Sequence, residues 1–468
     1  MTIISYNHFW DAIMRLPTTR KMLTLALSKC GGCGKSVLDS ALDDYVGSNE
    51  EKCEHCRLYS LIIRFWMEVL RNALAADKSK VQKILADSYA RRAIKSVVRG
   101  FIHFGVTKPL SIYSPLLVVW NFTYKCNLNC KHCYIDAGTD SRQELTTPEA
   151  LAVVDQLAEA GVTSLAFSGG EPLMRKDFFE VARHAVDRGL YVSLATNGTL
   201  LDKRTVKRLK EIGIHYVEVS IDSIHPEVHD QFRGKPGAFH KSLSGLKNCA
   251  EEDMITCLAV TASKKNLEDL PDLLELGMDI PVARFTLFNF VPVGRGKENV
   301  SLDPSSEERE ELMKVLLNKI LEDPDIAILT TIPQLARVAL QYQGEQDHII
   351  MPLAHMQSTG ISRSAVALAD FIGGCGAGRF YCAISPEGYL QPCVFLPINV
   401  GDLKLDNFEE IWLKSNLFNL LRDRSTLKGP CGECDFKYVC GGCRARAFAY
   451  HNDILASDPG CILVSQSS

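Results

Sequence analysis

The residues with the clearest chemical potential are three cysteines, Cys126, Cys130 and Cys133, in the segment YKCNLNCKHCY. Three thiolates on one short loop can hold three irons of a cubane iron–sulfur cluster. The fourth iron then has no protein ligand, so a small molecule can bind it and receive an electron there. The alternative is a zinc site made by the three cysteines and His132. The residues around the triplet decide between these two interpretations.

Short apolar runs alternate with amphipathic helical stretches from about residue 114 to 293, and the triplet follows the first run. Six strands are predicted: Leu116–Phe122, Thr163–Phe167, Tyr191–Ala195, Tyr216–Ile221, Ile255–Thr261 and Arg284–Phe290. Helices are predicted between them at 147–161, 177–188, 203–212, 239–251 and 267–276. This alternation predicts an α/β fold with buried parallel strands in a partial (β/α)6 TIM-like barrel. Active sites of such barrels lie at the carboxyl ends of the strands, where the triplet falls.

Glycines and polar residues follow the other predicted strands. Gly169 and Gly170, after the second strand, would let a ligand approach the main chain closely. Arg233 offers a planar guanidinium that can pair with both oxygens of a carboxylate. Polar residues also end the third and fourth predicted strands, Asn197 after the one and Ser220 and Asp222 at the end of the other. Each also has a purely structural interpretation, as a turn residue, a polar strand residue or a surface charge.

A second group of cysteines lies near the carboxyl terminus. Its members are Cys375, Cys382, Cys393, Cys431, Cys434, Cys440, Cys443 and Cys461. With Gly388, the first part reads C–x12–G–x4–C, and the second reads C–x2–C–x5–C–x2–C before a distant last cysteine. Eight thiolates can fully ligate two cubane clusters, or they can hold two structural zinc ions.

Together, these two signatures resemble those of radical S-adenosylmethionine (radical SAM) enzymes with a SPASM extension, over about 114–300 and 371–465. One departure is that Cys440 and Cys443 are separated by two residues where three are usual. The resemblance implies that SAM binds the open iron and is cleaved to a 5′-deoxyadenosyl radical. That radical would abstract hydrogen from an unactivated carbon, giving net oxidation or C–C or C–S bond formation. The triplet in this context is then an iron–sulfur site rather than a zinc site.

The resemblance also implies ligand sets and partners. SAM would contact Gly169, Gly170, Glu171, Asn197, Ser220, Asp222, Arg233 and His132. Two auxiliary [4Fe-4S] clusters would be held, the first by Cys375, Cys382, Cys393 and Cys443 and the second by Cys431, Cys434, Cys440 and Cys461. An electron donor such as ferredoxin or flavodoxin is expected. No residue has a spacing that marks it as the catalytic acid or base.

The substrate is not specified by these motifs. The resembling enzymes act on peptides, tetrapyrroles or other cofactor-like substrates, and radical modification of a membrane lipid is an alternative. From a different class, the chain could be a non-enzymatic iron–sulfur electron carrier or a zinc-dependent scaffold. The Gly169–Gly170 motif disfavours both, because neither needs a SAM pocket.

The amino-terminal region carries its own cysteine pairs, Cys30 with Cys33 and Cys53 with Cys56. Nineteen residues separate the pairs, which is typical of a zinc ribbon. We therefore expect a structural zinc ion there, with a further iron–sulfur cluster as the rival interpretation.

A helix predicted at about 80–104 carries basic residues among apolar ones: Arg91, Arg92, Lys95 and Arg99. Such a helix can meet a membrane surface or an anionic substrate. More often it packs on its own protein, so peripheral membrane contact is a secondary expectation.

The length of 468 residues predicts several domains. We expect an N-terminal helical region with the metal site at 1–110, the radical SAM core at 111–300, a helical bridge at 301–370 and the SPASM domain at 371–468. The net charge of −4 gives no indication of a nucleic-acid partner. No apolar run is long enough to span a membrane, and clustered cysteine pairs are typical of metal binding in a reducing compartment. A cytoplasmic, oxygen-sensitive protein is expected.

Overall fold

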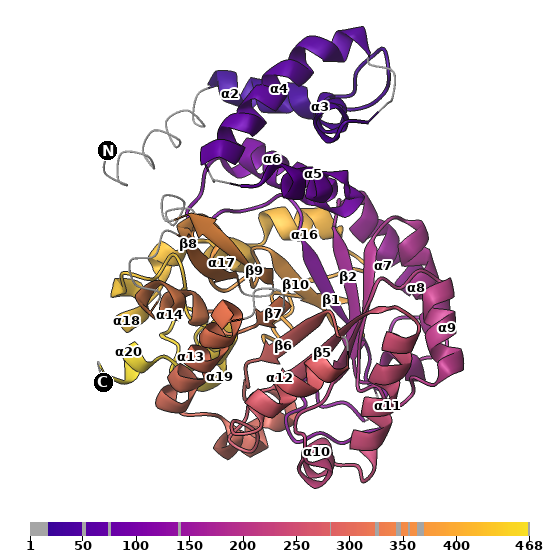
Figure 1. The fold of residues 1–468 in the computed structure, drawn as a ribbon, viewed down its shortest axis with the longest axis vertical. Helices are drawn as coiled ribbons and strands as arrows, with labels where there is room; N and C mark the ends of the chain where they lie inside the picture. The colour runs from indigo at the N-terminus through magenta and orange to yellow at the C-terminus, as the bar shows by residue number, and fades with distance from the viewer. Residues whose placement is uncertain are drawn as a thin grey trace.

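The computed structural model describes residues 17–48, 53–73, 76–138, 142–280, 282–322, 327–342, 348–353, 356–362 and 369–466. Its centre is a ten-stranded sheet (Figure 1). The strands are β1 (Leu117–Thr123), β2 (Ser164–Gly169), β3 (Tyr191–Thr196), β4 (Tyr216–Ser220), β5 (Ile255–Thr261), β6 (Arg284–Phe288), β7 (Ala327–Thr330), β10 (Tyr381–Ile384), β11 (Tyr389–Gln391) and β12 (Gly401–Asp402). Their order is β12-β11-β10-β1-β2-β3-β4-β5-β6-β7. All neighbours from β10 to β7 are parallel, so the predicted partial barrel is confirmed.

The two faces of the strands differ in residue type, and this difference builds the barrel. The outward face of β1 carries Trp120 and Phe122, which are fully buried against Phe167 of β2 and the covering helices. The inward face carries smaller or polar residues, such as Ser164 and Ser168 of β2. Because successive side chains of a strand alternate between faces, the apolar side packs on helices while the polar side surrounds an internal cavity.

Helices between the parallel strands cover the outside of the barrel (Figure 1). They are α7 (Thr147–Glu159), α8 (Phe178–Asp187), α9 (Lys203–Glu211), α10 (Pro226–Arg233), α11 (Ala238–Glu251) and α12 (Leu270–Asp279). In α7, the buried residues recur at helical spacing and join the main core: Ala150, Val153, Val154 and Leu157. The predicted helix positions in this part of the chain are confirmed to within a few residues.

The segment at 301–370 was predicted to be a helical bridge, and this prediction is wrong in part. It contains α13 (Ser306–Glu322) and α14 (Leu335–Tyr342), but also β7 between them and the hairpin of β8 (His348–Leu353) and β9 (Met356–Ser362). β7 pairs in parallel with β6 and extends the barrel sheet. A four-residue apolar run such as AILT has too few residues to show its period, so strand and helix are indistinguishable there from sequence.

The carboxyl-terminal part extends the sheet beyond β1 and adds short helices. These are α15 (Ala369–Ile372), α16 (Phe408–Lys414), α17 (Asn416–Arg422), α18 (Gly429–Glu433), α19 (Arg444–His451) and α20 (Ile462–Ser465), with the 3-10 turn η4 (Arg424–Thr426). Two further 3-10 turns belong to the barrel, η1 (Pro172–Met174) after β2 and η2 (Gly294–Leu302) after β6. Trp412 and Phe418 of α16 and α17 are fully buried in the main core. This part therefore packs directly on the barrel.

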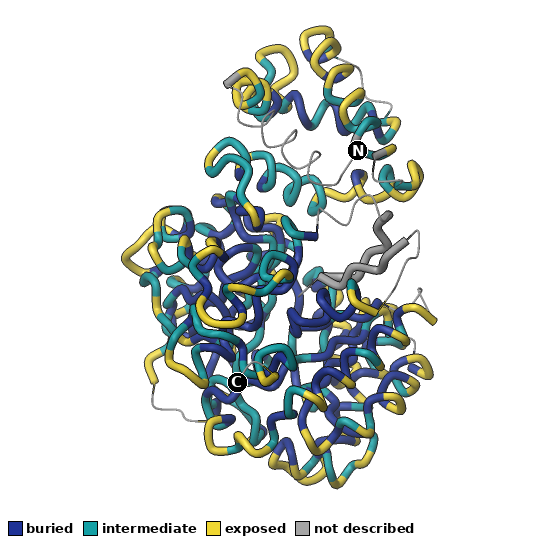
Figure 2. The backbone as a smooth tube through the Cα atoms, turned by 90° about the vertical axis from the view of Figure 1, so that its left-hand side faces the viewer, coloured by how far each residue is buried: buried dark blue, intermediate teal, exposed yellow. Residues whose placement is uncertain are grey.

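Among the described residues, five helices precede the barrel and lie beyond one end of it (Figure 1). They are α2 (Pro17–Leu27), α3 (Val37–Val46), α4 (Glu54–Ala73), α5 (Lys78–Ala86) and α6 (Ser88–Phe104). The single helix predicted at 80–104 is two helices, because Asp87 caps the second one by accepting hydrogen bonds from the N–H groups of Tyr89 and Ala90. Figure 2 shows that these helices are far less buried than the barrel.

The basic side chains of α6 are used within the protein. Arg91 and Lys95 form ion pairs with Asp43 and Asp39 of α3. Arg92 donates a hydrogen bond to the carbonyl oxygen of Val162 in the barrel. The predicted basic helix thus attaches the amino-terminal helices to the barrel. No helix among the described residues is long and apolar enough to cross a membrane.

Candidate active site and metal centres

The cysteine triplet lies directly after β1, on the loop that the barrel pattern predicted. Cys126, Cys130 and Cys133 all line a cavity of about 430 Å³ inside the barrel. Burial raises the pKa of Cys126 to about 11 and that of Cys130 to about 12, and nearby thiols add to the effect. Thiols crowded into a dry site in this way are suited to bind metal, since a positive centre stabilises the thiolate form.

The geometry argues against a single zinc ion at the triplet. Ligand sulfurs around one tetrahedral zinc lie about 3.8 Å apart, given Zn–S bonds of about 2.3 Å. Within the described part of the chain, the ligand atoms of the triplet do not form a group with all atoms within 4.8 Å of one another. His132 stacks its ring on Phe232, with centroids 4.1 Å apart. Both observations disfavour a single zinc ion held by the triplet and His132.

The two glycines after β2 are required by packing against the cysteine loop. The N–H of Gly170 donates to the carbonyl oxygen of Thr123, and that of Glu171 donates to the carbonyl oxygen of Lys125, both at 2.7 Å. A Cβ atom on Gly170 would lie 2.1 Å from the Lys125 oxygen. Gly169 has φ of 116°, a conformation that favours glycine. The motif therefore holds the triplet loop and the cavity wall together.

Glu171 points away from the cavity, towards the end of β3. Its carboxylate accepts hydrogen bonds from the hydroxyl of Thr196 and the N–H of Asn197. Burial raises the pKa of Glu171 to about 7, partly opposed by these hydrogen bonds. Glu171 thus positions the strand end, while Gly169, Gly170 and Asn197 form the cavity wall.

Asp222 and Arg233 form a buried ion pair beside the triplet. The Nε of Arg233 lies 2.6 Å from Oδ2 of Asp222, and its Nη1 lies 4.0 Å from Sγ of Cys130. Burial alone would raise the pKa of Asp222, but the charge of Arg233 outweighs it and holds that pKa below its ordinary value. Arg233 lines the cavity together with Ser220 and His132, whereas Asp222 lies behind it.

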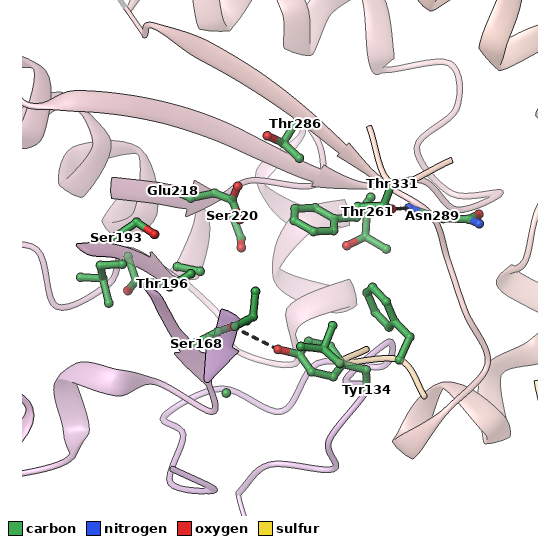
Figure 3. A pocket seen from close by; sticks show the side chains of 18 of the residues that line it. Tyr134, Ser168, Ser193, Thr196, Glu218, Ser220, Thr261, Thr286, Asn289 and Thr331 are labelled. Atoms are coloured by element: carbon green, nitrogen blue, oxygen red, sulfur yellow. Dashed lines mark hydrogen bonds between the residues drawn. The ribbon is translucent and has the colours of Figure 1, made fainter. Parts of the chain in front are cut away.

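Sequence analysis missed a set of polar side chains deeper in the barrel (Figure 3). Glu218 lies two residues before Ser220 on β4 and faces the same cavity, and burial raises its pKa to about 7. The hydroxyl of Tyr134 hydrogen-bonds to Asn121 and Ser168 on the opposite side. The period-2 alternation of strands, counted back from Ser220, would have identified Glu218.

The carboxyl-terminal cysteines gather around two cavities. Cys431, Cys434, Cys440 and Cys461 line one of about 530 Å³, which brings the predicted second set together. Cys375, Cys393 and Cys443 line the other, which is much smaller, at about 20 Å³. The fourth member predicted for that set, Cys382, does not line it and is buried in the main core instead.

Buried arginines surround these cysteine groups. Arg424 is 4% exposed, and within the described residues its guanidinium hydrogen-bonds to backbone carbonyl oxygens, including those of Gly373 and Cys375. Burial lowers its pKa to about 10, opposed by the thiols of Cys375 and Cys440. A buried guanidinium without a carboxylate is costly, and an anionic iron–sulfur cluster at each cysteine group would compensate its charge.

The four amino-terminal cysteines form a much tighter group. Sγ of Cys30 lies 3.7 Å from Sγ of Cys53, and Sγ of Cys33 lies 3.7 Å from Sγ of Cys56. All four sulfurs lie within 4.8 Å of one another. These distances match the edge of about 3.8 Å expected for four thiolates around one zinc ion.

Comparisons with known proteins agree with this geometry. The family model described as "Radical SAM superfamily" matches residues 120–277, and SPASM, described as an iron-sulfur cluster-binding domain, matches residues 375–435. The chain is 38% identical over 351 residues to the AdoMet-dependent heme synthase of Methanosarcina barkeri, covering 75% of this chain and 97% of that protein. It is 34% identical over 367 residues to the Fe-coproporphyrin III synthase of the same organism, covering 75% and 88%.

More distant similarities extend to peptide-modifying proteins. The chain is 30% identical over 358 residues to the PqqA peptide cyclase of Bradyrhizobium diazoefficiens, covering 75% of this chain and 86% of that protein. Among solved structures, Streptococcus suis SuiB bound to S-adenosylmethionine superposes with a TM-score of 0.62 and 17% identity, covering 91% of this chain and 93% of that one. At that identity, the similarity establishes the fold alone.

Proposed function

The chain belongs to the radical SAM superfamily and carries a SPASM domain, and from this premise we propose that it modifies a carboxylate-bearing tetrapyrrole. The observation that carries the proposal is the 38% identity to a heme synthase over 97% of that protein's length. The cavity supports it, since apolar side chains such as Phe380 and Phe395 share its wall with the basic residue Arg284. A flat macrocycle with acidic side chains suits such a wall.

We propose that Cys126, Cys130 and Cys133 hold the cluster that binds SAM. When bound, this group supplies the electron that cleaves SAM to the 5′-deoxyadenosyl radical. The chain's own residues orient SAM: Arg233 presents its Nη groups to the carboxylate, because its Nε is already held by Asp222. The barrel keeps water from the reacting atoms by enclosing them.

The remaining predicted SAM contacts divide into two kinds. Gly169, Gly170, Asn197, Ser220 and His132 line the cavity and are proposed to touch SAM directly. Glu171 and Asp222 lie behind the wall, so we propose that they position their neighbours.

The remaining candidate metal sites are the carboxyl-terminal and amino-terminal cysteine groups. We propose a [4Fe-4S] cluster at Cys431, Cys434, Cys440 and Cys461, and a second one at the group formed by Cys375, Cys393 and Cys443. The cavity lined by Cys431, Cys434, Cys440 and Cys461 is open to the surface beside Cys434, which is only half-buried. An external electron donor such as ferredoxin or flavodoxin would reach the chain there. At Cys30, Cys33, Cys53 and Cys56 we propose zinc.

The test is anaerobic incubation of the cluster-loaded chain with SAM, a reductant and an iron porphyrin that carries propionate side chains. We expect a shift of the Soret absorption on binding and faster release of 5′-deoxyadenosine, with a changed mass of the porphyrin. Cys130→Ala should bind the porphyrin but release no 5′-deoxyadenosine. Absence of both the Soret shift and the stimulation would contradict the tetrapyrrole proposal.

A peptide substrate is the second candidate, because the PqqA peptide cyclase is 30% identical over 86% of its length. Differential mass spectrometry of cells carrying the native chain or Cys130→Ala separates the two. Loss of a product from the peptide fraction favours the peptide, and loss from the organic extract favours the tetrapyrrole or a lipid.

A further inference from the structure

The placement of Cys382 on β10 turns it away from the other cysteines. Tyr381 and Ala383, its neighbours in the strand, belong to the cluster of buried residues that includes Cys393 and Cys443. Cys382 and Ile384 belong to the main core on the opposite face, together with Trp412. Because side chains alternate along a strand, no rotamer of Cys382 reaches the first face without moving β10. The parallel pairing of β10 with β1 fixes its register and places Cys382 opposite Val118.

The lining of the cavity shows the same separation. Cys375, Cys393 and Cys443 line one cavity together, and Cys382 is not among the residues that line it. Three thiols therefore share one space, and the fourth lies on the other face of the strand.

The wall between this cysteine group and the barrel cavity is shared. Asn289, Val291, Thr331 and Phe395 line both spaces, and Asn289 and Thr331 stand at one side of the cavity in Figure 3. Asn289 is 1% exposed, and its Nδ2 has no hydrogen-bond partner among the described residues. The hydroxyl of Thr331 accepts a hydrogen bond from the N–H of Asn289, at 2.8 Å, so its own proton is left to donate. Two hydrogen-bond donors, the amide of Asn289 and the hydroxyl of Thr331, thus lie at the wall between the cysteine group and the barrel cavity.

We infer that Cys375, Cys393 and Cys443 hold the first auxiliary cluster without Cys382, and that its fourth iron faces the barrel cavity. An iron with an open position there would take an anionic oxygen ligand, stabilised by the amide of Asn289 and the hydroxyl of Thr331. The ligand class is a substrate carboxylate, a choice that rests on the proposed function. The auxiliary cluster would then hold the substrate opposite the SAM site. Cys382 is a core residue.

The first test is metal content. Cys382→Ala should keep the same iron per chain and the same Mössbauer spectrum as the native protein, whereas Cys393→Ala should lose about four irons. Cys249→Ala, at another fully buried cysteine, controls for loss of core packing. Loss of one cluster from Cys382→Ala, with thermal stability equal to that of the Cys249→Ala control, would overturn the inference.

The second test probes the open iron without using a tetrapyrrole. In a Cys126→Ala/Cys130→Ala/Cys133→Ala chain the SAM cluster is absent, so any exchangeable iron belongs to an auxiliary cluster. We expect ¹³C-cyanide, and separately ¹³C-propionate, to show hyperfine coupling to the reduced cluster. Coupling to neither probe overturns the open site, and coupling to cyanide alone overturns the carboxylate assignment. Failure of the tetrapyrrole proposal would leave the cyanide result unchanged.

An independent observation concerns the outer face of α4. Leu58, Leu61 and Phe65 are 65%, 54% and 62% exposed, and Ile62 and Trp66 are also exposed. Their spacing of three and four residues places them on one stripe of the helix. On the opposite face, Cys56 and Ser60 are buried. A contiguous exposed apolar stripe of this kind marks an interaction surface.

The charge of this part of the chain indicates what the stripe contacts. Residues 1–110 contain 17 Lys and Arg against 10 Asp and Glu, a net charge of +7, whereas the rest of the chain carries −11. Arg57 is exposed at one edge of the stripe, and Arg64, seven residues further along the same edge, has its Nη1 3.9 Å from a carboxylate oxygen of Asp44. We propose that the exposed face of α4 docks on an anionic lipid bilayer, with the aromatic rings in the interface and the basic residues at the headgroups.

Flotation of the full cluster-loaded chain with vesicles tests this surface. We expect binding to vesicles containing anionic phosphatidylglycerol, weaker binding in high salt, and little binding to zwitterionic vesicles. Leu61→Glu/Phe65→Glu should reduce binding at least tenfold, while Ile84→Glu, at a 58% exposed site on α5, should not. Equal flotation of native chain and double variant would overturn the proposal. So would a native dimer that the double variant dissociates, or covering of the stripe by residues 1–16 detected by cross-linking.

Discussion

The ion pair between Arg233 and Asp222 allows a stabilising role to be separated from a binding role. We predict that Arg233→Met destabilises the protein, because it leaves the carboxylate of Asp222 buried without its partner. The same substitution should abolish SAM binding, because Arg233 is the proposed partner of the SAM carboxylate. Asp222 is 1% exposed, and Oδ2 lies 2.6 Å from the guanidinium. Its other oxygen accepts a hydrogen bond from the N–H of Thr261, so it has no freedom to turn towards water.

The magnitude follows from the burial of both partners. Removing one member of a buried ion pair costs about 3–5 kcal/mol, since the remaining charge stays desolvated. At about 2 °C per kcal/mol for a folding unit of this size, the melting temperature should fall by about 6–10 °C. In the native chain, the lowered pKa of Asp222 stabilises the fold at neutral pH, and this contribution is lost only as the pH falls through that low pKa. In Arg233→Met, burial raises the pKa of Asp222. The loss of stability relative to the native chain should therefore be largest near neutral pH and smaller in acid.

The assay is anaerobic thermal unfolding at pH 7.5 and pH 5, together with equilibrium binding of SAM. The matched control is Arg233→Met/Asp222→Asn, which removes the unpaired charge. It should recover most of the lost melting temperature but none of the SAM affinity. An unchanged melting temperature in Arg233→Met would refute the claim that the pair stabilises the fold. Native SAM affinity in the double variant would refute the assignment of Arg233 to the SAM carboxylate.

Three further predictions follow from the same structure. Gly170→Ala should displace the cysteine loop, because the new Cβ would lie 2.1 Å from the Lys125 oxygen, and iron analysis should show about four irons fewer per chain. The control Gly31→Ala, whose new Cβ would have no atom within 4 Å, should keep the full iron content. Glu218→Gln should stabilise the fold by about 3 kcal/mol at pH 8 and not at pH 4. The pKa of Glu218 is raised to about 7, so the native protein loses stability as the pH rises from about 4.5 through 7, and the glutamine variant does not. An equal effect at both pH values in unfolding experiments would contradict this. Cys56→Ser should lose zinc but no iron in elemental analysis, and loss of iron would instead indicate a cluster at that site.

Sequence periodicity was enough to place the strands β1 to β6, but sequence analysis identified neither β7 nor inner-face residues such as Glu218. The predicted β5 has the observed ends, Ile255–Thr261, and it lies within a mostly apolar run between Asp253 and Ser263. The orientation of side chains at the strand ends was not predictable. Glu171 and Asp222 turn behind the cavity wall because backbone N–H groups and Arg233 attract their carboxylates there, and those partners come from other loops.

Counting cysteines by spacing failed to distinguish Cys382 from its neighbours for a related reason. The strand YCAI is buried on both faces, so no hydrophobic alternation shows which face of β10 Cys382 occupies. The face is decided by pairing with β1, whose own alternation places Val118 outward and Val119 towards the cavity. A spacing motif reports which residues lie close along the chain, but ligation depends on the direction of each side chain.

The amino-terminal helices show how the same ambiguity affects amphipathic surfaces. Both α4 and α6 alternate apolar and basic residues, and sequence analysis selected α6 as the candidate for surface contact. In the structure, Arg91 and Lys95 of α6 pair with carboxylates of α3, which removes their charge from the surface. The apolar stripe of α4 stays exposed, because the opposite face, with Cys56 of the four-cysteine group, is directed towards the core of this region. The four-cysteine group therefore determines which face of the helix remains exposed.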